Sequence, residues 1–173
     1  MGLKRAPYFV LFTTVLIWCS LLFAPPLLSA LEAPTLSHVA YRFFSRICHQ
    51  YDARSLHVLG YPLAVCARCS AIYFGFLGGM LVAALCPTRE RRRFTLWLLL
   101  VLLPVLIDVV LDGTGVHASN VFTRISTGLI FGIGSGVALA PLFAEVLDLF
   151  LSKITLRSNF VKFSQERENA EAG

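Results

Sequence analysis

Four long apolar runs constrain this sequence more than any other feature. They cover residues 8–31, 63–86, 94–111 and 121–150. A helix made from any of these runs can cross the roughly 30 Å hydrocarbon core of a bilayer. Only 14% of the residues are charged, whereas a soluble domain carries about 25%. The sequence therefore predicts an all-α integral membrane protein with four transmembrane helices.

Basic residues flank the apolar runs and predict the topology. They are Lys4 and Arg5 before the first run, residues 89–93 after the second, and Lys153, Arg157 and Lys162 after the fourth. Lys and Arg concentrate on the cytoplasmic side of membrane proteins, so both termini should be cytoplasmic. We expect one membrane domain over 1–152 and a polar cytoplasmic tail over 153–173, disordered from residue 164 onward. This topology explains the net charge of +5 without nucleic-acid binding.

The first run predicts a retained transmembrane helix. It is too long for the apolar part of a cleaved signal peptide, and no small-residue cleavage site follows it. Pro25 and Pro26 lie near its end, where they should kink or end the helix because proline cannot donate a backbone hydrogen bond.

Residues 36–49 have the pattern of a helix that lies on the membrane. Their apolar residues recur every three or four positions, at Leu36, Val39, Phe43 and Ile47. The segment is too polar to cross the bilayer, so we expect a short interfacial helix on the outer face. Residues 51–61 should then form a loop that closes at Gly60 and Pro62.

Small residues recur every fourth position in the second and fourth runs. They are Ala67, Ala71, Gly75, Gly79 and Ala83 in the second run, and Gly128, Gly132, Gly136 and Ala140 in the fourth. Such stripes let membrane helices approach closely, so these two helices should pack together. Arg124 continues the stripe by one step and should point into the bundle.

The topology brings chemically reactive residues to one end of the bundle. They are Cys48 and His49 at the end of the interfacial helix, Cys66, Arg68 and Cys69 at the start of the second run, Asp108 and Asp112 at the end of the third, and Arg124 at the start of the fourth. All of them should lie at the extracytoplasmic end, where they can form one site.

The first interpretation of this site is metal binding. Zinc prefers thiolate and imidazole ligands, which this site offers at Cys48, His49, Cys66 and Cys69. Copper and iron also bind such ligands. Asp108 or Asp112 could replace one donor and leave an open, catalytic position. Cys48 and His49 are adjacent and cannot easily both reach one ion, so we expect one of them to orient a ligand without binding the metal itself. On this interpretation Asp108, Asp112, His49 and Arg124 are the catalytic candidates, and the substrate is a lipid or small molecule at the outer face.

Two other interpretations use the same residues. Cys66 and Cys69 form a C-x-x-C at a helix start beside Arg68, which is typical of thiol–disulfide redox proteins. Alternatively Arg54, Arg68 and Arg124 bind an anionic head group or a transported anion. A purely structural ion pair between Asp108 or Asp112 and Arg124, holding the third and fourth spans together, is the alternative to a functional role for those charges. Sulfur atoms joined in a pair would favour redox chemistry, and three or four converging donors would favour a metal.

Several short motifs together resemble an uncharacterised family of prokaryotic membrane proteins, domain of unknown function 2085. They are CHQ at 48–50, Arg54-Ser55, CARCSAIYFG at 66–75, Asp112-Gly113, Ser119-Asn120, Arg124 and Thr127-Gly128. The resemblance covers roughly residues 45–136, and Ala71 stands where the family is expected to have Gly. It implies a small helical protein of a prokaryotic inner or plasma membrane. It implies no established activity.

Overall fold

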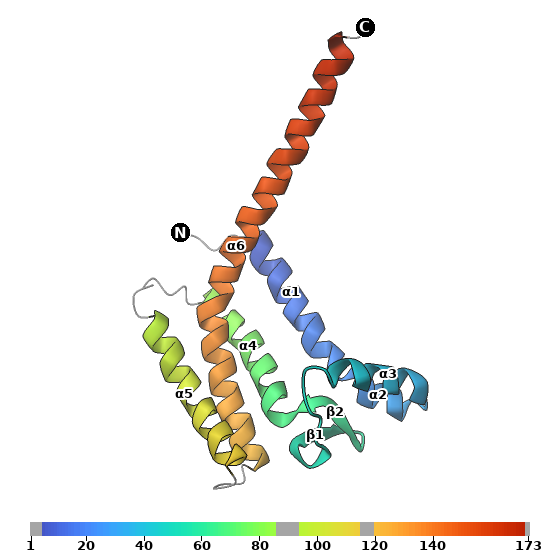
Figure 1. The fold of residues 1–173 in the computed structure, drawn as a ribbon, viewed down its shortest axis with the longest axis vertical. Coiled ribbons are helices and arrows are strands. Elements are labelled where there is room, and N and C mark those ends of the chain that lie inside the picture. The colour runs from blue at the N-terminus through green and yellow to red at the C-terminus, as the bar shows by residue number, and fades with distance from the viewer. Residues whose placement is uncertain (1–4, 86–93, 115–119, 172–173) are drawn as a thin grey trace.

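The structure is a computed structural model that describes residues 5–85, 94–114 and 120–171, with side chains described over 6–85, 100–114 and 120–153. The elements in chain order are α1 (Arg5–Leu21), α2 (Ala24–Ala30), α3 (Pro34–Phe44), the short 3₁₀ helix η1 (Asp52–Arg54), β1 (Ser55–Val58), β2 (Tyr61–Cys66), α4 (Ala67–Leu85), α5 (Phe94–Gly113) and α6 (Val121–Glu171). In Figure 1, α4, α5 and α6 lie side by side, and α2, α3 and the two strands gather at one end of the bundle.

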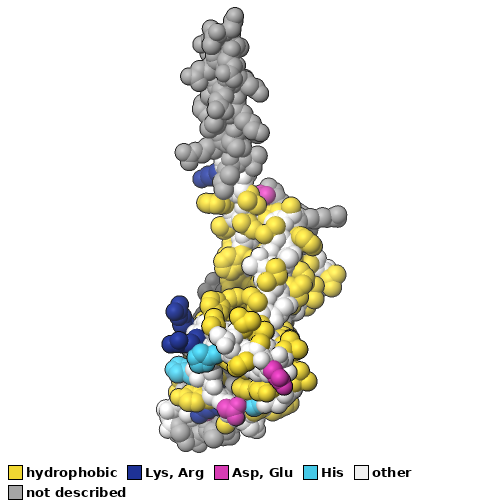
Figure 2. Space-filling view, turned by 90° about the vertical axis from the view of Figure 1, so that its right-hand side faces the viewer, with side chains coloured by type: hydrophobic (Ala, Val, Ile, Leu, Met, Phe, Trp, Pro, Cys, Tyr) yellow, Lys and Arg dark blue, Asp and Glu magenta, His cyan; other side chains and the backbone are white. Residues whose placement is uncertain are grey.

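Three stretches of the described chain are long and apolar enough to cross a membrane. They are Ala6–Ala30, Ala67–Leu85 and Val121–Lys153. Helix α5 is a further helix of 20 residues that packs against α6. Apolar side chains cover most of the body in Figure 2, while charged and histidine side chains gather toward the end that holds the strands. The basic segment 89–93 and Cys86, the predicted end of the second span, lie outside the described residues.

The first apolar run forms two helices because of its proline pair. Helix α1 ends at Leu21, and α2 begins at Ala24 with Pro25 and Pro26 in its first turn. A proline costs nothing there, since the first N–H groups of a helix have no partner within the helix. Both prolines are fully buried. The predicted interruption of the helix is confirmed.

Residues 55–66 form an antiparallel β-hairpin, so the prediction of a loop over 51–61 is wrong for this part. Val58 pairs with Tyr61 and Ser55 with Cys66. Between the strands, Leu59 and Gly60 have φ of 54° and 83°, which is the backbone of a tight two-residue hairpin turn. The hairpin occupies the start of the predicted second span, which therefore begins at Ala67 and not at 63.

Helix α3 is shorter than the predicted helix 36–49 and ends at Phe44. The N–H groups of Ile47 and Cys48 both donate to Phe44 O, at 3.0 and 3.1 Å, which turns the chain out of the helix. Gln50 then adopts φ of 51°, a left-handed conformation that an α-helix does not contain. Cys48 and His49 consequently lie in the segment after α3.

Helices α4 and α6 pack backbone to backbone along their small residues, as predicted. A Cβ built on Gly75 would lie 3.0 Å from Gly132 Cα, and one built on Gly79 would lie 3.0 Å from Gly136 Cα. These separations leave no room for a side chain at any of the four positions. The two helices form the most extensive contact in the fold.

Helix α6 is much longer than the predicted fourth span of 121–150. It runs unbroken for 51 residues to Glu171 and extends past the rest of the bundle (Figure 1). The predicted disorder of the tail from residue 164 is therefore wrong as far as Glu171. The predicted span ended at the last apolar residue of the run. The helix continues because its backbone hydrogen bonding extends through the polar residues that follow.

Candidate metal centre

Three cysteine thiols meet where the hairpin runs into α4. Cys48 lies after α3, Cys66 is the last residue of β2, and Cys69 is in the first turn of α4. Their sulfur atoms all lie within 4.8 Å of one another. Cys48 is buried, and Cys66 and Cys69 are half-buried. All three are free thiols.

Gln50 fixes the segment that carries Cys48. Its side-chain amide donates to Tyr41 O at 3.0 Å and to Ala64 O at 2.7 Å, and so joins the end of α3 to β2. The Tyr41 hydroxyl donates to Pro62 O at 2.5 Å between the same two elements. Gln50 was absent from the predicted site residues. Its place two positions after Cys48 in the CHQ motif was the signal that could have found it.

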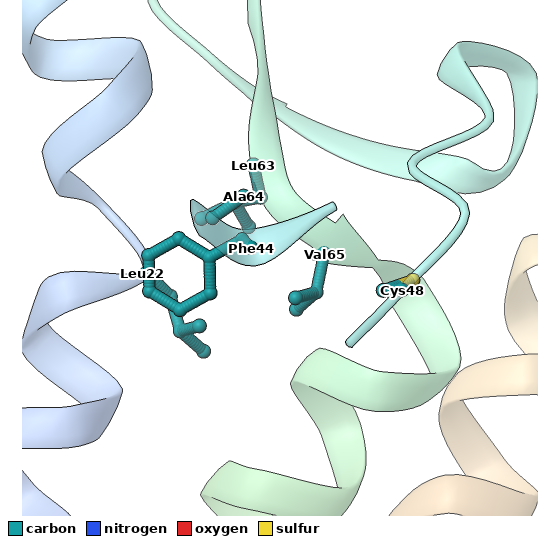
Figure 3. Close-up of a cluster of buried hydrophobic side chains, with 6 residues drawn as sticks. All are labelled: Leu22, Phe44, Cys48, Leu63, Ala64 and Val65. Carbon is teal, nitrogen blue, oxygen red and sulfur yellow. The ribbon is translucent and has the colours of Figure 1, made fainter. Parts of the chain in front are cut away.

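An apolar wall backs the thiols on the side of α1 and α3. Figure 3 shows Leu22, Phe44, Leu63, Ala64 and Val65 clustered with Cys48. Ala64 N–H also donates to Leu22 O at 3.3 Å, which attaches β2 to the break between α1 and α2. The wall keeps water away from one side of the thiols, which strengthens electrostatic interactions there.

Two neighbouring thiols lower the pKa of the Cys48 thiol below its ordinary value. Hydrogen bonding with the Cys66 side chain has the largest effect, and hydrogen bonding with the Cys69 side chain follows. The N–H of Cys66 also donates to Cys48 Sγ, at 3.3 Å. Donors that stabilise a charged sulfur favour its ionised form, which is the form that binds metals.

His49 is separate from the three thiols. Its ring is exposed and stacks on Tyr51, with ring centroids 6.0 Å apart and planes 2° apart. The metal-ligating group found in the described residues contains Cys48, Cys66 and Cys69 without a histidine or carboxylate. Cys19 is a buried thiol on α1 outside this group.

Two carboxylates of α5 bind arginines from three other elements beside the thiols. Arg68, which lies between Cys66 and Cys69, forms an ion pair with buried Asp108, and the Thr127 hydroxyl donates to the same carboxylate at 3.3 Å. Asp112 lies one turn further along α5. These contacts tie the end of α5 to α4 and α6.

Asp112 accepts from two arginines that differ in exposure. Arg124 Nη2 lies 2.7 Å from its carboxylate, and Arg54 Nη1 lies 3.3 Å from it. The Arg124 side chain is only 5% exposed, while that of Arg54 is 47% exposed. The inward orientation predicted for Arg124 is confirmed, as is an ion pair between Arg124 and an aspartate of α5.

The sequence matches the profile of a family described as "Predicted membrane protein (DUF2085)" over residues 48–138, more than half of the chain. The chain belongs to this family. The resemblance of its short motifs to DUF2085 is thereby confirmed. The match begins at Cys48 and contains the three thiols and both ion-paired aspartates, whereas α1, α2 and α3 precede it.

Two archaeal relatives are named only as uncharacterized proteins. A protein of Methanocaldococcus jannaschii is 32% identical over 114 residues, which are 65% of this chain and 73% of the relative. A protein of Methanothermobacter thermautotrophicus is 37% identical over 106 residues, which are 61% of this chain and 96% of the relative. No solved structure matches the chain. The DUF2085 relatives therefore add no activity to what the site itself suggests.

Proposed function

We propose that this DUF2085 protein binds a soft or borderline metal ion through Cys48, Cys66 and Cys69. The proposal rests on one observation. The sulfur atoms of these three cysteines, which come from three separate segments, all lie within 4.8 Å of one another. Tetrahedral zinc with Zn–S bonds of about 2.3 Å holds its sulfurs roughly 3.8 Å apart. A shift of about 1 Å in the most distant sulfur would therefore suffice for a metal to be held.

Three protein ligands are the number found in catalytic zinc sites, which keep a fourth position for water or substrate. Zinc is our first choice, and copper or iron also accept thiolate ligands. His49 could supply the fourth ligand only if its ring left Tyr51. The proposed role of the metal is that of a Lewis acid toward a lipid or small substrate, and the protein would then be a metal-dependent membrane enzyme.

The ion-paired residues beside the thiols are proposed to position that substrate. Arg68 lies between Cys66 and Cys69 in sequence and forms an ion pair with Asp108. This ion pair and the proposed metal site therefore lie at the same end of α4. Arg124 could orient a bound molecule, and the carboxylates of Asp108 and Asp112 could orient it or accept a proton from it. For the alternative of anion binding or transport, an anion would have to compete with a carboxylate at each of Arg54, Arg68 and Arg124.

The membrane topology that we propose has four spans, with both termini in the cytoplasm and the thiols at the extracytoplasmic end. The flanking basic residues support this orientation. Helix α3 would lie in the outer interface, because its apolar stripe is unburied. Its members Leu36, Val39 and Phe43 are 52% to 61% exposed, and Ile47, just after the helix, is 47% exposed. A bilayer interface would cover such a stripe.

Elemental analysis of protein purified in mild detergent without chelators tests the proposal. We expect close to one zinc, copper or iron ion per chain, lost in Cys66→Ala and retained in Cys19→Ala. The control removes a buried thiol that lies outside the group. Equal metal content in both variants, or none in the unmodified protein, would rule out the three-thiol site.

A graded variant tests how the site is held. Gln50→Ala removes both hydrogen bonds that place Cys48 against β2, without removing a ligand. Groups that orient metal ligands typically change affinity by about 10- to 100-fold, so we expect metal affinity to fall by at least about tenfold. Competition with a chromogenic chelator measures the change. Unchanged affinity would show that Gln50 does not position Cys48.

Thiol–disulfide exchange is the second candidate, because Cys66 and Cys69 face each other in the same group. In that reaction two thiols form one disulfide, and the two electrons and two protons pass to a disulfide of a protein or small molecule, which becomes two thiols. A metal-free protein whose Cys66 and Cys69 interconvert reversibly with a disulfide would favour this function. Metal retention with no such interconversion would exclude it.

A further inference from the structure

We propose that a groove beside α1 holds the acyl tail of a bilayer phospholipid with its head group at the thiol site. This inference rests on the proposed function and names the substrate class of that site. The groove has a volume of about 550 Å³ and lies among α1, α4 and α6. We call it the α1 groove, and the residues that line it include Thr14, Trp18, Leu21, Tyr73, Phe76 and Ser135.

The α1 groove lies beside the second half of α1, because the first half packs directly on α4 and α6. Tyr8 donates a hydrogen bond to Met80 O, and Leu11 and Phe12 pack against the same buried cluster. Further along α1, Trp18 makes an edge-on contact with Tyr73, at a centroid distance of 6.0 Å. On α1 the lining of the groove runs from Thr14 to Leu21, within the apolar stretch of this helix.

The wall of the α1 groove selects hydrocarbon. It is almost wholly apolar. Its two small hydroxyl side chains hydrogen-bond within their own helices, Thr14 to Val10 O at 2.9 Å and Ser135 to Gly132 O at 3.0 Å. A polar ligand would lose its hydrogen bonds to water on entering and find few replacements, whereas an acyl tail loses none.

The α1 groove is continuous with the surface that faces lipid. Ile17 and Leu21 line it and are 55% and 45% exposed. All three of its helices belong to the stretches that can cross a membrane. A tail can therefore enter sideways from the bilayer, and a phospholipid is the commonest source of such a tail there.

One end of the α1 groove adjoins the thiols. Trp18 and Tyr73 line the groove and also pack against the apolar cluster that contains Cys48. Tyr73 follows Cys69 by one helical turn. A tail in the groove would thus place its polar end near Cys69, the half-buried thiol of the group one turn before Tyr73. This juxtaposition of a hydrocarbon groove and a candidate metal site points to a phospholipid as the ligand.

Quenching of Trp18 fluorescence tests the proposal. The chain has two tryptophans, so Trp97→Phe leaves Trp18 as the single reporter. Phosphatidylcholine with brominated acyl tails is titrated into this protein in detergent micelles. We expect saturable quenching, stronger for bromines near the head group than for bromines near the methyl end. Quenching that rises without saturation, or the reverse order of the two probes, would overturn the proposal.

Two neighbouring threonines provide matched variants. Thr14→Phe places a ring in the groove, while Thr13→Phe adds the same ring outside it; both threonines bond the carbonyl four residues earlier. We expect Thr14→Phe to weaken lipid binding about tenfold, equivalent to roughly two buried methylene groups, and Thr13→Phe to leave it unchanged. Equal effects of the two variants would contradict the proposal. So would a change of oligomeric state in Thr14→Phe without saturable quenching, since the groove would then hold a second copy.

Metal content measured on the same samples separates this proposal from the proposed function. Saturable quenching in a protein that binds no metal would support the groove and remove the metal site. Stoichiometric metal with unsaturable quenching would support the metal site and remove the lipid ligand.

Discussion

Helix α6 and helix α1 both pack against α4, and they do so in opposite ways. Along α6 the contact is made by glycines, whose backbones approach until no Cβ would fit. Along α1 the contact is made by large side chains, from Tyr8 and Phe12 near one end to Trp18 near the other, with the α1 groove beside the second half of the helix. Close packing of small residues leaves no cavity, whereas packing by a few large residues leaves room for a ligand.

The two contacts differ in extent, and this difference gives them different structural roles. Contact between α4 and α6 gains dispersion energy along many atoms and fixes the position of Arg68, Cys69 and Arg124. Contact with α1 gains less, because it is less extensive. The polar site is therefore attached to the rigid pair, and the ligand route that we propose follows the more loosely packed helix.

The largest effect is expected at the glycine contact. A Cβ on Gly79 would lie 2.9 Å from Val137 N and 3.0 Å from Gly136 Cα, and backbone atoms cannot move aside individually. We expect Gly79→Ala to lower the free energy of unfolding by about 3 kcal/mol. Denaturant titration in mixed micelles, followed by circular dichroism, measures it. Gly78→Ala is the control, since its Cβ meets no atom within 4 Å. It should be neutral or stabilising by up to about 1 kcal/mol.

An intermediate effect is expected where the small-residue stripe of α6 ends, at Arg124. Arg124→Met leaves Asp112 with one fewer cation in a buried setting, and we expect a loss of about 2 kcal/mol, because unpairing a buried charge is costly. Arg54→Met removes the half-exposed partner of the same carboxylate and should cost less than about 1 kcal/mol. The same titration compares them. Equal losses would show that burial of Arg124 does not strengthen its ion pair.

The smallest effect is expected at the Tyr8 end of α1. Tyr8→Phe removes the hydrogen bond to Met80 O and keeps the ring, so the loss should be about 1 kcal/mol. Tyr61→Phe removes a hydroxyl from an exposed side chain and should change stability by less than about 0.5 kcal/mol. A loss at Tyr8 as large as that at Gly79 would remove the contrast between the two contacts.

Features set by spacing along one helix were predictable from the sequence. The four-residue interval of the glycines identified the helix pair, and the proline pair located the break after α1. Each follows from helical geometry or from the missing N–H of proline. The C-x-x-C kept Cys66 close to Cys69 through their short separation in sequence, although Cys66 ends β2 and only Cys69 lies on α4. The gathering of Cys48 with those two followed from topology, because the ends of alternate segments share one side of a membrane.

Features set by contacts between segments were not predictable. The hairpin was missed because Leu59-Gly60 lacks the usual Asn-Gly or Asp-Gly signal and its strands have only four and six residues. Arg68 was expected to bind anions, and its ion pair with Asp108 depends on where a long side chain reaches between helices. The His49 ring lies apart from the thiol group because α3 ends at Phe44, before the chain reaches Cys48. Sequence patterns define the end of a helix poorly.

The length of α6 sets a distance between the membrane and the end of the described chain. At 1.5 Å per residue its 51 residues measure roughly 75 Å, more than twice the hydrocarbon thickness. The part beyond Lys153, where the apolar stretch ends, is roughly 27 Å long. Because the helix has no break there, this part acts as a rod. Whatever contacts its tip is held clear of the head groups and turns with the same helix that carries Arg124.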